Sequence, residues 1–357
     1  MNDRRPLFSI AVPAYNAERT IADTIGSIQS QTIDDWELVV VDDGSTDATT
    51  SIVEESARSD ARIRLVKQGL NYGAGTARNR GIEEARGLYL WIPDADDTFD
   101  TDLLERCARA LAENPAAITL FGVAETYLDD EGNITREHAM TFDEARCADA
   151  ESLRELALPL ERCALYGYGA NKVYDLDFLR STGARFENEP LCEDFFFNVK
   201  VFQNAPSLNV LSGAPYHYGK RAEGTLTRAF VPDYYEIHRR RIQEMRDQLE
   251  SWGLLDNEAK STLGSLFARY ILSEAEHIHD ARSAMDAQAR REWIASVFAD
   301  PLFEELVPSA EADDLLLKVC LIPFKRRQAD AVLALGRAVH LVRDHAEVVY
   351  SIARQGR

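Results

Sequence analysis

The chain has 357 residues, of which 45% are hydrophobic and 28% charged, and its formal net charge is −20. This composition is that of a globular protein, and the charge argues against binding nucleic acid through a broad basic face. No apolar run approaches the roughly 18 to 20 residues that span a bilayer. Strand-like sequence follows the N-terminus at once, without the apolar region of a signal peptide. We therefore expect a cytoplasmic protein, and the five widely spaced cysteines favour buried free thiols.

The first 123 residues alternate between short apolar runs and stretches with helical spacing. The pattern predicts strands over 8–12, 37–41, 63–66, 88–92 and 118–123, and helices over 18–31, 47–58, 74–86 and 101–113. Strands separated by helices form parallel β-α-β units with helices on both faces of the sheet. The fold class is therefore α/β, Rossmann-like, with a mostly parallel sheet.

After residue 123 the pattern changes. A strand over 124–128 leads into an expected hairpin turn at 129–133, a helix follows over 150–165, and short mixed elements run to about 230. Beyond that only helices are predicted, over 233–252, 257–281, 288–299 and 311–322, followed by one or two in the tail. The chain thus divides into an α/β domain, 1–230, and an all-helical C-terminal region, 231–357.

The stretch LWIPDADDTF places Asp94, Asp96 and Asp97 at the carboxyl end of a predicted strand. Three neighbouring carboxylates repel one another unless a cation neutralises them, and a hard ion such as Mn²⁺ or Mg²⁺ takes oxygen ligands. Ligands of open α/β sheets bind at this edge. The alternative is a polar loop that starts the next helix, with Asp100 or Thr101 as N-cap.

Two other strands end in polar groups at the same edge, in VPAYN (residues 12–16) and DDGS (residues 42–45). Three such segments predict one crevice, although Asp43 or Ser45 alone could be a helix cap. Gly73-Ala74-Gly75 does not complete a dinucleotide-binding fingerprint, because Arg78 occupies the third glycine position. Arg78 and Asn79, near a helix start, could instead meet an anionic ligand.

Two later segments carry further candidates. Glu193 and Asp194 stand in aromatic sequence, where burial suits a general base, but the same pair could cap a helix. His217, Lys220 and Arg221 form a basic cluster that could hold a diphosphate or lie in a solvated loop.

Taken in order, these segments resemble a bacterial family 2 glycosyltransferase with the GT-A fold, over about residues 7–230. The resemblance rests on SIAVPAYNAE, WELVVVDDGSTD, NYGAGTARNRGIEEARGLYLWIPDADD, NKVYDLDFLRSTGARF, CEDFFFNVKVF and PYHYGKRAEGTLT. Each motif is ordinary alone, and their order and spacing together are specific. Pro93 departs from the leucine that is more usual before the acidic motif.

The resemblance implies a role for each matching residue. A nucleotide pocket would involve Pro13, Tyr15, Asn16, Glu18, Asp43, Arg78 and Asp94. Asp94 and Asp96 would form the D-x-D motif at the metal, with Asp97 sharing that task. Asp194 would be the base, with Glu193 close to the acceptor, and His217 and Arg221 would approach the diphosphate. Sequence reasoning adds Tyr168, Asn171 and Lys172 on the sugar and acceptor side.

The implied activity is metal-dependent transfer from a nucleotide-sugar, usually a UDP-sugar, to a glycan or lipid-linked acceptor of the cell envelope. One base without a covalent nucleophile indicates a single displacement with inversion. A nucleotidyltransferase and a catalytically inactive nucleotide-sugar or glycan-binding module are the alternatives. For 231–357, a helical cap, a homodimer interface and peripheral membrane contact all stay open. Residues 315–357 carry eight Lys or Arg and three Asp or Glu.

Overall fold

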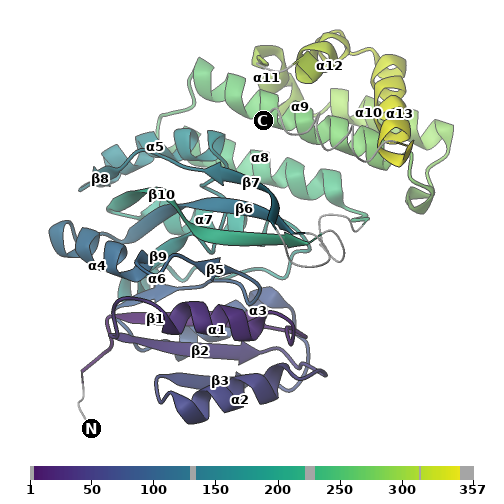
Figure 1. Cartoon of the computed structure of the whole chain (residues 1–357). Coiled ribbons are helices and arrows are strands. Elements are labelled where there is room, and N and C mark those ends of the chain that lie inside the picture. Colours follow the sequence, from purple (N-terminus) through teal and green to yellow (C-terminus); the bar gives the residue numbers. More distant parts are fainter. Residues whose placement is uncertain (1–3, 129–133, 222–229, 313–314, 346–357) are drawn as a thin grey trace. The chain divides into compact units, whose positions relative to one another are not determined.

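The computed structural model describes residues 4–128, 134–221, 230–312 and 315–345. The chain divides into two compact units, the first ending at Arg228 and the second beginning at Ala229. The first unit is built on a sheet and the second consists of helices (Figure 1).

In the first unit, strands and helices alternate as far as β4, and the later elements are mixed. Its strands are β1 (Phe8–Ala14), β2 (Trp36–Asp42), β3 (Ile63–Lys67), β4 (Tyr89–Trp91), β5 (Thr98–Phe99), β6 (Ile118–Leu128), β7 (Ile134–Met140), β8 (Ala145–Cys147), β9 (Lys172–Asp175) and β10 (Leu208–Arg221). Its helices are α1 (Ile21–Gln29), α2 (Thr49–Ser59), α3 (Ala74–Glu84), α4 (Leu103–Glu113), α5 (Ala150–Arg162), α6 (Leu176–Thr182) and α7 (Glu193–Asn204).

The strands form one sheet in the order β3-β2-β1-β4-β9-β6-β10-β5, with β7 beside β6 and β8 beside β10. The four N-terminal strands β3, β2, β1 and β4 are mutually parallel. Their carboxyl ends therefore meet at one edge, as the polar segments in the sequence predict. The α/β fold class is confirmed, including the all-helical region that follows the sheet.

The second half of the sheet differs from the prediction. β9 lies between β4 and β6 and is antiparallel to both, and residues 118–128 form one strand where two were expected. Local periodicity identifies a strand but not its neighbours, so a short strand such as β9 carries no sign of its central place. The predicted hairpin turn at 129–133 lies outside the described residues.

Three helices of the second unit begin where aspartates provide N-caps. The side chains of Asp256, Asp286 and Asp300 accept from the backbone N–H groups of Ala259, Ala289 and Leu302 at the starts of three helices. The helices are α8 (Tyr234–Ser251), α9 (Asn257–His277), α10 (Ala287–Phe298), α11 (Pro301–Leu306), α12 (Leu315–Lys325) and α13 (Ala329–His345).

The long helix α9 is the centre of this unit, and α8, α11, α12 and α13 all pack against it. It ends at His277, four residues before the predicted end, because the chain turns into a short 3₁₀ segment at Ala281–Ser283. Residues 311 and 312, where the next helix was predicted to start, are not helical. Within the described ranges, no helix has the length and apolarity needed to cross a membrane.

Candidate active site

The loops after β1 and β2 are locked together by side chains from the first of them. Oδ1 of Asn16 accepts from the backbone N–H of Thr46 at 2.9 Å, and Oε2 of Glu18 accepts from the N–H of Ala48 at 3.0 Å. Pro13 lies half-buried within β1. Asn16 and Glu18 thus fix the shape of this rim of the crevice.

Asp43, directly after β2, organises a second loop. Its Oδ1 accepts from Nε2 of Gln68 at 2.7 Å and from the N–H of Tyr72 at 2.9 Å, and its Oδ2 accepts from the N–H of Gly73 at 2.8 Å. Asp43 itself is 2% exposed, whereas the tyrosines of the two loops, Tyr15 and Tyr72, are 48% and 52% exposed. The two loops therefore present two aromatic rings to solvent at this edge.

Arg78 on α3 connects the acidic strand end with the acidic pair on α7. Its guanidinium donates to Oδ1 of Asp94 at 2.8 Å and to Oε1 of Glu193 at 3.0 Å, and it lies 3.6 Å from Oδ1 of Asp194. The ring of Phe186 lies 5.4 Å from the guanidinium carbon. Burial acts to lower the pKa of Arg78, but the three carboxylates outweigh burial and raise this pKa well above its ordinary value.

Glu193 and Asp194 occupy the first turn of α7, where the helix dipole favours negative charge. The helix begins two residues before the expected start near Phe195, after Cys192, which has a left-handed φ of 63°. Burial raises the pKa of Glu193, and the adjacent charge of Asp194 raises it further, whereas Arg78 opposes both effects. The two acids therefore differ in their surroundings although they are neighbours in the chain.

The two carboxylate oxygens of Asp194 have different surroundings. Its Oδ2 accepts from the backbone N–H of Gly169 at 2.9 Å, while its Oδ1 is buried and has no hydrogen-bond partner among the described residues. A Cβ atom at position 169 would lie 2.9 Å from Oδ1 and 2.9 Å from Cγ of Asp194, closer than real Cβ contacts. Glycine at 169 is thus required for this arrangement, and Oδ1, without a hydrogen bond in the described part of the chain, lies 3.6 Å from the guanidinium of Arg78.

Beneath this loop, Lys172 and Asn171 are fully buried. Nζ of Lys172 donates to the carbonyl oxygen of Leu165 at 3.0 Å, to Oδ1 of Asn171 at 2.7 Å and to the carbonyl oxygen of Tyr168. Three acceptors match the three N–H groups of an ammonium. Burial nevertheless lowers the pKa of Lys172 to about 7, and the charge of Asp194 opposes that effect. The structure thus brings both residues under the loop that carries Gly169, away from its surface.

Asp97 differs from its acidic neighbours because it is 1% exposed. The hydroxyl of Tyr216 donates to its Oδ2, and the N–H of Gly219 donates to its Oδ1 at 3.1 Å. Burial raises the pKa of Asp97 well above its ordinary value, and the charges of Asp94 and Asp96 add to this. Asp97 therefore ties the acidic loop to β10.

Among the described residues, no three His, Cys, Asp or Glu side chains converge as a ready-made metal site. Asp96 is exposed, Asp94 faces Arg78, and Nε2 of His217 lies 2.8 Å from Oδ1 of Asp100. Mg²⁺ commonly binds one or two carboxylates together with substrate phosphates, not a cage made by the protein alone. The donor set fits an ion of that kind. Arg221 ends β10, and its side chain lies outside the described part of the chain.

Three tyrosine side chains gather around Glu125, beside the loop that carries Gly169. The hydroxyl of Tyr168 donates to Oε1 of Glu125 at 2.9 Å, and that of Tyr127 donates to Oε2 at 3.3 Å. The rings of Tyr168 and Tyr218 meet edge to face, with centroids 6.2 Å apart. Burial, and then the charge of Glu125, raises the pKa of Tyr168 far above its ordinary value. Tyr168 thus keeps its hydroxyl proton, and its side chain is held in place by Glu125 and Tyr218.

The glycine-rich start of α3 serves close packing. A Cβ atom at Gly75 would lie 2.6 Å from the carbonyl oxygen of Glu187. Asn79 exchanges two hydrogen bonds of 2.9 Å with the backbone of Phe186. These contacts hold the segment before α7 against α3. Close packing therefore accounts for the glycine at position 75, and no bound dinucleotide is needed to explain it. Asn79 is occupied by them, so Arg78 alone of the two faces the carboxylates.

Sequence reasoning missed four residues of this region, namely Gly169, Glu125, Phe186 and Tyr216. The YGYGAN stretch offered a signal for the first, because two glycines beside Tyr168 indicate close approach of backbone. The other three act through partners far away in the chain and left no local signal.

Comparison with known proteins also points to a glycosyltransferase. A family model described as "Glycosyl transferase family 2" matches residues 9–165. Residues 9–165 are therefore similar to glycosyl transferase family 2. The match covers β1 to α5 and includes Asp43, Asp94 and Asp96, while Gly169 and Asp194 follow it.

Among named relatives, the chain is 34% identical over 148 residues to the putative teichuronic acid biosynthesis glycosyltransferase TuaG of Bacillus subtilis, which is 41% of this chain and 59% of that protein. It is 30% identical over 217 residues to the putative glycosyltransferase EpsH of the same organism, 60% of each chain. The chain thus spans about three fifths of the length of these relatives.

A solved structure of Staphylococcus aureus TarS, residues 1–349 in complex with UDP-GlcNAc, superposes with a TM-score of 0.62. The match covers 98% of this chain and 92% of that chain at 22% identity. This similarity supports the GT-A fold assigned to the first unit and extends over the helical unit.

Proposed function

We propose that residues 1–230 form an inverting, metal-dependent glycosyltransferase domain that uses a UDP-sugar. The acceptor would be a hydroxyl of a cell-envelope glycan, polysaccharide or lipid-linked molecule. The family of residues 9–165 supports the reaction class. The solved relative carries UDP-GlcNAc, and relatives are named for teichuronic acid biosynthesis and for poly(ribitol-phosphate) β-N-acetylglucosaminyl transfer, which supports the donor and acceptor classes.

The observation that carries this proposal is the position of Arg78. It joins Asp94, which follows the parallel strands, to Glu193 and Asp194 on α7. In a glycosyltransferase, the transferred sugar lies between the residues that bind the diphosphate and the base that accepts the proton of the acceptor hydroxyl. These two groups of residues must therefore be about one sugar ring apart. One guanidinium that contacts both acidic groups supports that arrangement.

On the donor side, the nucleotide would bind along the rim of Pro13, Tyr15, Asn16 and Glu18, beside Asp43. Asn16, Glu18 and Asp43 hold the two loops through their own hydrogen bonds, and the exposed rings of Tyr15 and Tyr72 offer faces for stacking on the base.

Asp96 would hold a divalent ion together with the diphosphate, with Asp94 beside it and with His217 and Arg221 approaching from β10. The ion would stabilise the negative charge that develops on the leaving diphosphate. Asp97 would serve this site indirectly, because its oxygens already accept from Tyr216 and Gly219.

Asp194 would take the proton of the acceptor hydroxyl through its Oδ1. As that proton moves, the hydroxyl oxygen bonds to the anomeric carbon and the bond to the diphosphate breaks on the opposite side, so the configuration inverts. Gly169 would fix the orientation of this carboxylate, and Glu193 and Tyr168 would line the acceptor side. Lys172 and Asn171 would support the loop from beneath.

The test is UDP release from a panel of UDP-sugars, with wild-type protein and Asp194→Asn. We expect release to fall at least a hundred-fold in the variant, within the range of lost acid–base catalysis, while UDP affinity changes less than about twofold. Wild-type release in the variant would remove Asp194 from the base role. Nucleotide binding without turnover in the wild type would favour the inactive binding module.

A further inference from the structure

The outer face of α12 is apolar and basic, although the chain as a whole is strongly acidic. Leu315, Val319 and Ile322 are 77%, 45% and 54% exposed, and their spacing of four and three residues places them on one side of the helix. Lys318 and Lys325 are exposed beside them, and α12 contains no acidic residue. We call these five residues the α12 face. The opposite side is buried in the helical unit through Leu317, Cys320, Leu321 and Phe324.

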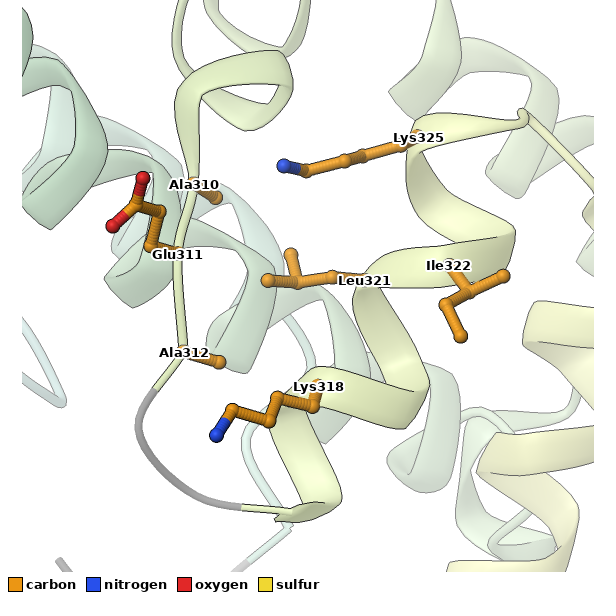
Figure 2. Close-up of a pocket in the computed structure, with 7 residues that line it drawn as sticks. All are labelled: Ala310, Glu311, Ala312, Lys318, Leu321, Ile322 and Lys325. Atoms are coloured by element: carbon orange, nitrogen blue, oxygen red, sulfur yellow. The ribbon is translucent and has the colours of Figure 1, made fainter.

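A hollow of about 420 Å³ lies along this helix, between α12 and the segment 310–312. Figure 2 shows Lys318 and Lys325 extending toward that segment, with Leu321 between them. The carboxylate of Glu311 points to the other side of the segment (Figure 2). Two ammonium groups above an apolar floor match the chemistry of a phosphate attached to acyl chains.

We propose that the α12 face docks on an anionic lipid bilayer. Lipid phosphates would lie between Lys318 and Lys325, and the three exposed apolar side chains would enter the interfacial layer. An amphipathic helix with a basic polar side binds anionic membranes in this way. The proposal rests on no assumption about the transfer reaction.

Charge supports a membrane over a second copy of the chain as the occupant. A protein with net charge −20 is repelled by an anionic surface, so contact requires a local positive patch. A two-fold contact through the same face would bring like-charged lysines together. Arg326, also exposed, follows the helix and adds to the positive charge.

The experiment is co-sedimentation of the full chain with vesicles of phosphatidylcholine alone or with 30% phosphatidylglycerol. We expect binding only to the anionic vesicles and release by high salt. Lys318→Ala with Lys325→Ala should lower the partition constant about 25-fold, since each lysine near an anionic surface contributes about a factor of five. Leu315→Gln with Ile322→Gln should also lower it at constant charge.

The matched control is Arg58→Ala with Arg109→Ala, which removes two exposed cations from the first unit and should leave the partition constant within about twofold. Equal binding of the lysine variant and the wild type would overturn the proposal, as would equal binding to neutral vesicles or none to either. A dimer in light scattering that Ile322→Gln dissociates, without vesicle binding, would assign the face to self-association instead.

Discussion

The backbone N–H of Gly169 donates to Oδ2 of Asp194 at 2.9 Å, and the glycine leaves no room for a Cβ atom beside that carboxylate. The loop before β9 and the first turn of α7 are thus in contact through a backbone N–H, at an approach that only a residue without a Cβ atom permits. If Asp194 is the base, the geometry of its carboxylate depends on a residue with no side chain.

Gly169→Ala should therefore lower kcat about a hundred-fold, because displacing the base by about 1 Å has an effect of that order. UDP affinity should stay within twofold, since the donor rim is built by other loops. Gly26→Ala, where an added Cβ meets nothing within 4 Å, is the matched control and should leave kcat unchanged. Equal kcat for both variants would contradict the positioning role.

Arg78→Met should raise the pKa of Glu193, which NMR titration of the side-chain carboxyl groups can follow. Arg78 lowers the pKa of Glu193 against burial, and carboxylates that lose a neighbouring cation keep their protons to higher pH. Removal of one partner from a buried ion pair should also cost about 3–5 kcal/mol of stability. Arg58→Met, on the surface, should change neither quantity. An unchanged titration of Glu193 in a folded Arg78→Met protein would show that Arg78 does not set the ionisation of this residue.

Asp96 and Asp97 should have different functions, Asp97 in stability and Asp96 in metal binding. Asp97→Ala removes a buried acceptor from Tyr216 and Gly219, so thermal or urea unfolding should show a loss of about 1–3 kcal/mol. Asp96→Ala, at an exposed position, should change stability by less than about 0.5 kcal/mol and abolish stimulation of UDP release by Mn²⁺. Retained metal stimulation in Asp96→Ala would exclude that residue as the metal ligand.

The sequence predicted the parallel strands and the convergence of their polar ends, because β-branched runs and turn residues are local signals. It placed Asp94, Asp96 and Asp97 together correctly but could not distinguish them. Their difference comes from Tyr216 and Gly219, about 120 residues further along the chain. Likewise, the central place of β9 depends on pairing with β4 and β6, which no local pattern encodes.

Lys172 should give stability a specific pH dependence. Burial lowers its pKa in the folded chain to about 7, below the value of 10.5 expected when unfolded. Between these two pKa values the unfolded chain binds more protons than the folded chain. The free energy of unfolding therefore rises with pH across this window. Below pH 7 the buried ammonium is charged in the folded chain and its destabilising effect is complete. Urea unfolding at pH 7.5, 8.5 and 9.5 should show a slope about 1.4 kcal/mol per pH unit smaller in Lys172→Met than in the wild type. Equal slopes would show that Lys172 stays charged across the window.

Calorimetric titration of UDP, GDP and CMP, each with and without Mn²⁺, tests the central claim most directly. The account predicts that UDP binds most tightly and that a chelator or Asp96→Ala weakens this binding. If none of the nucleotides binds the wild-type protein with Mn²⁺ present, the account of a UDP-sugar transferase is contradicted.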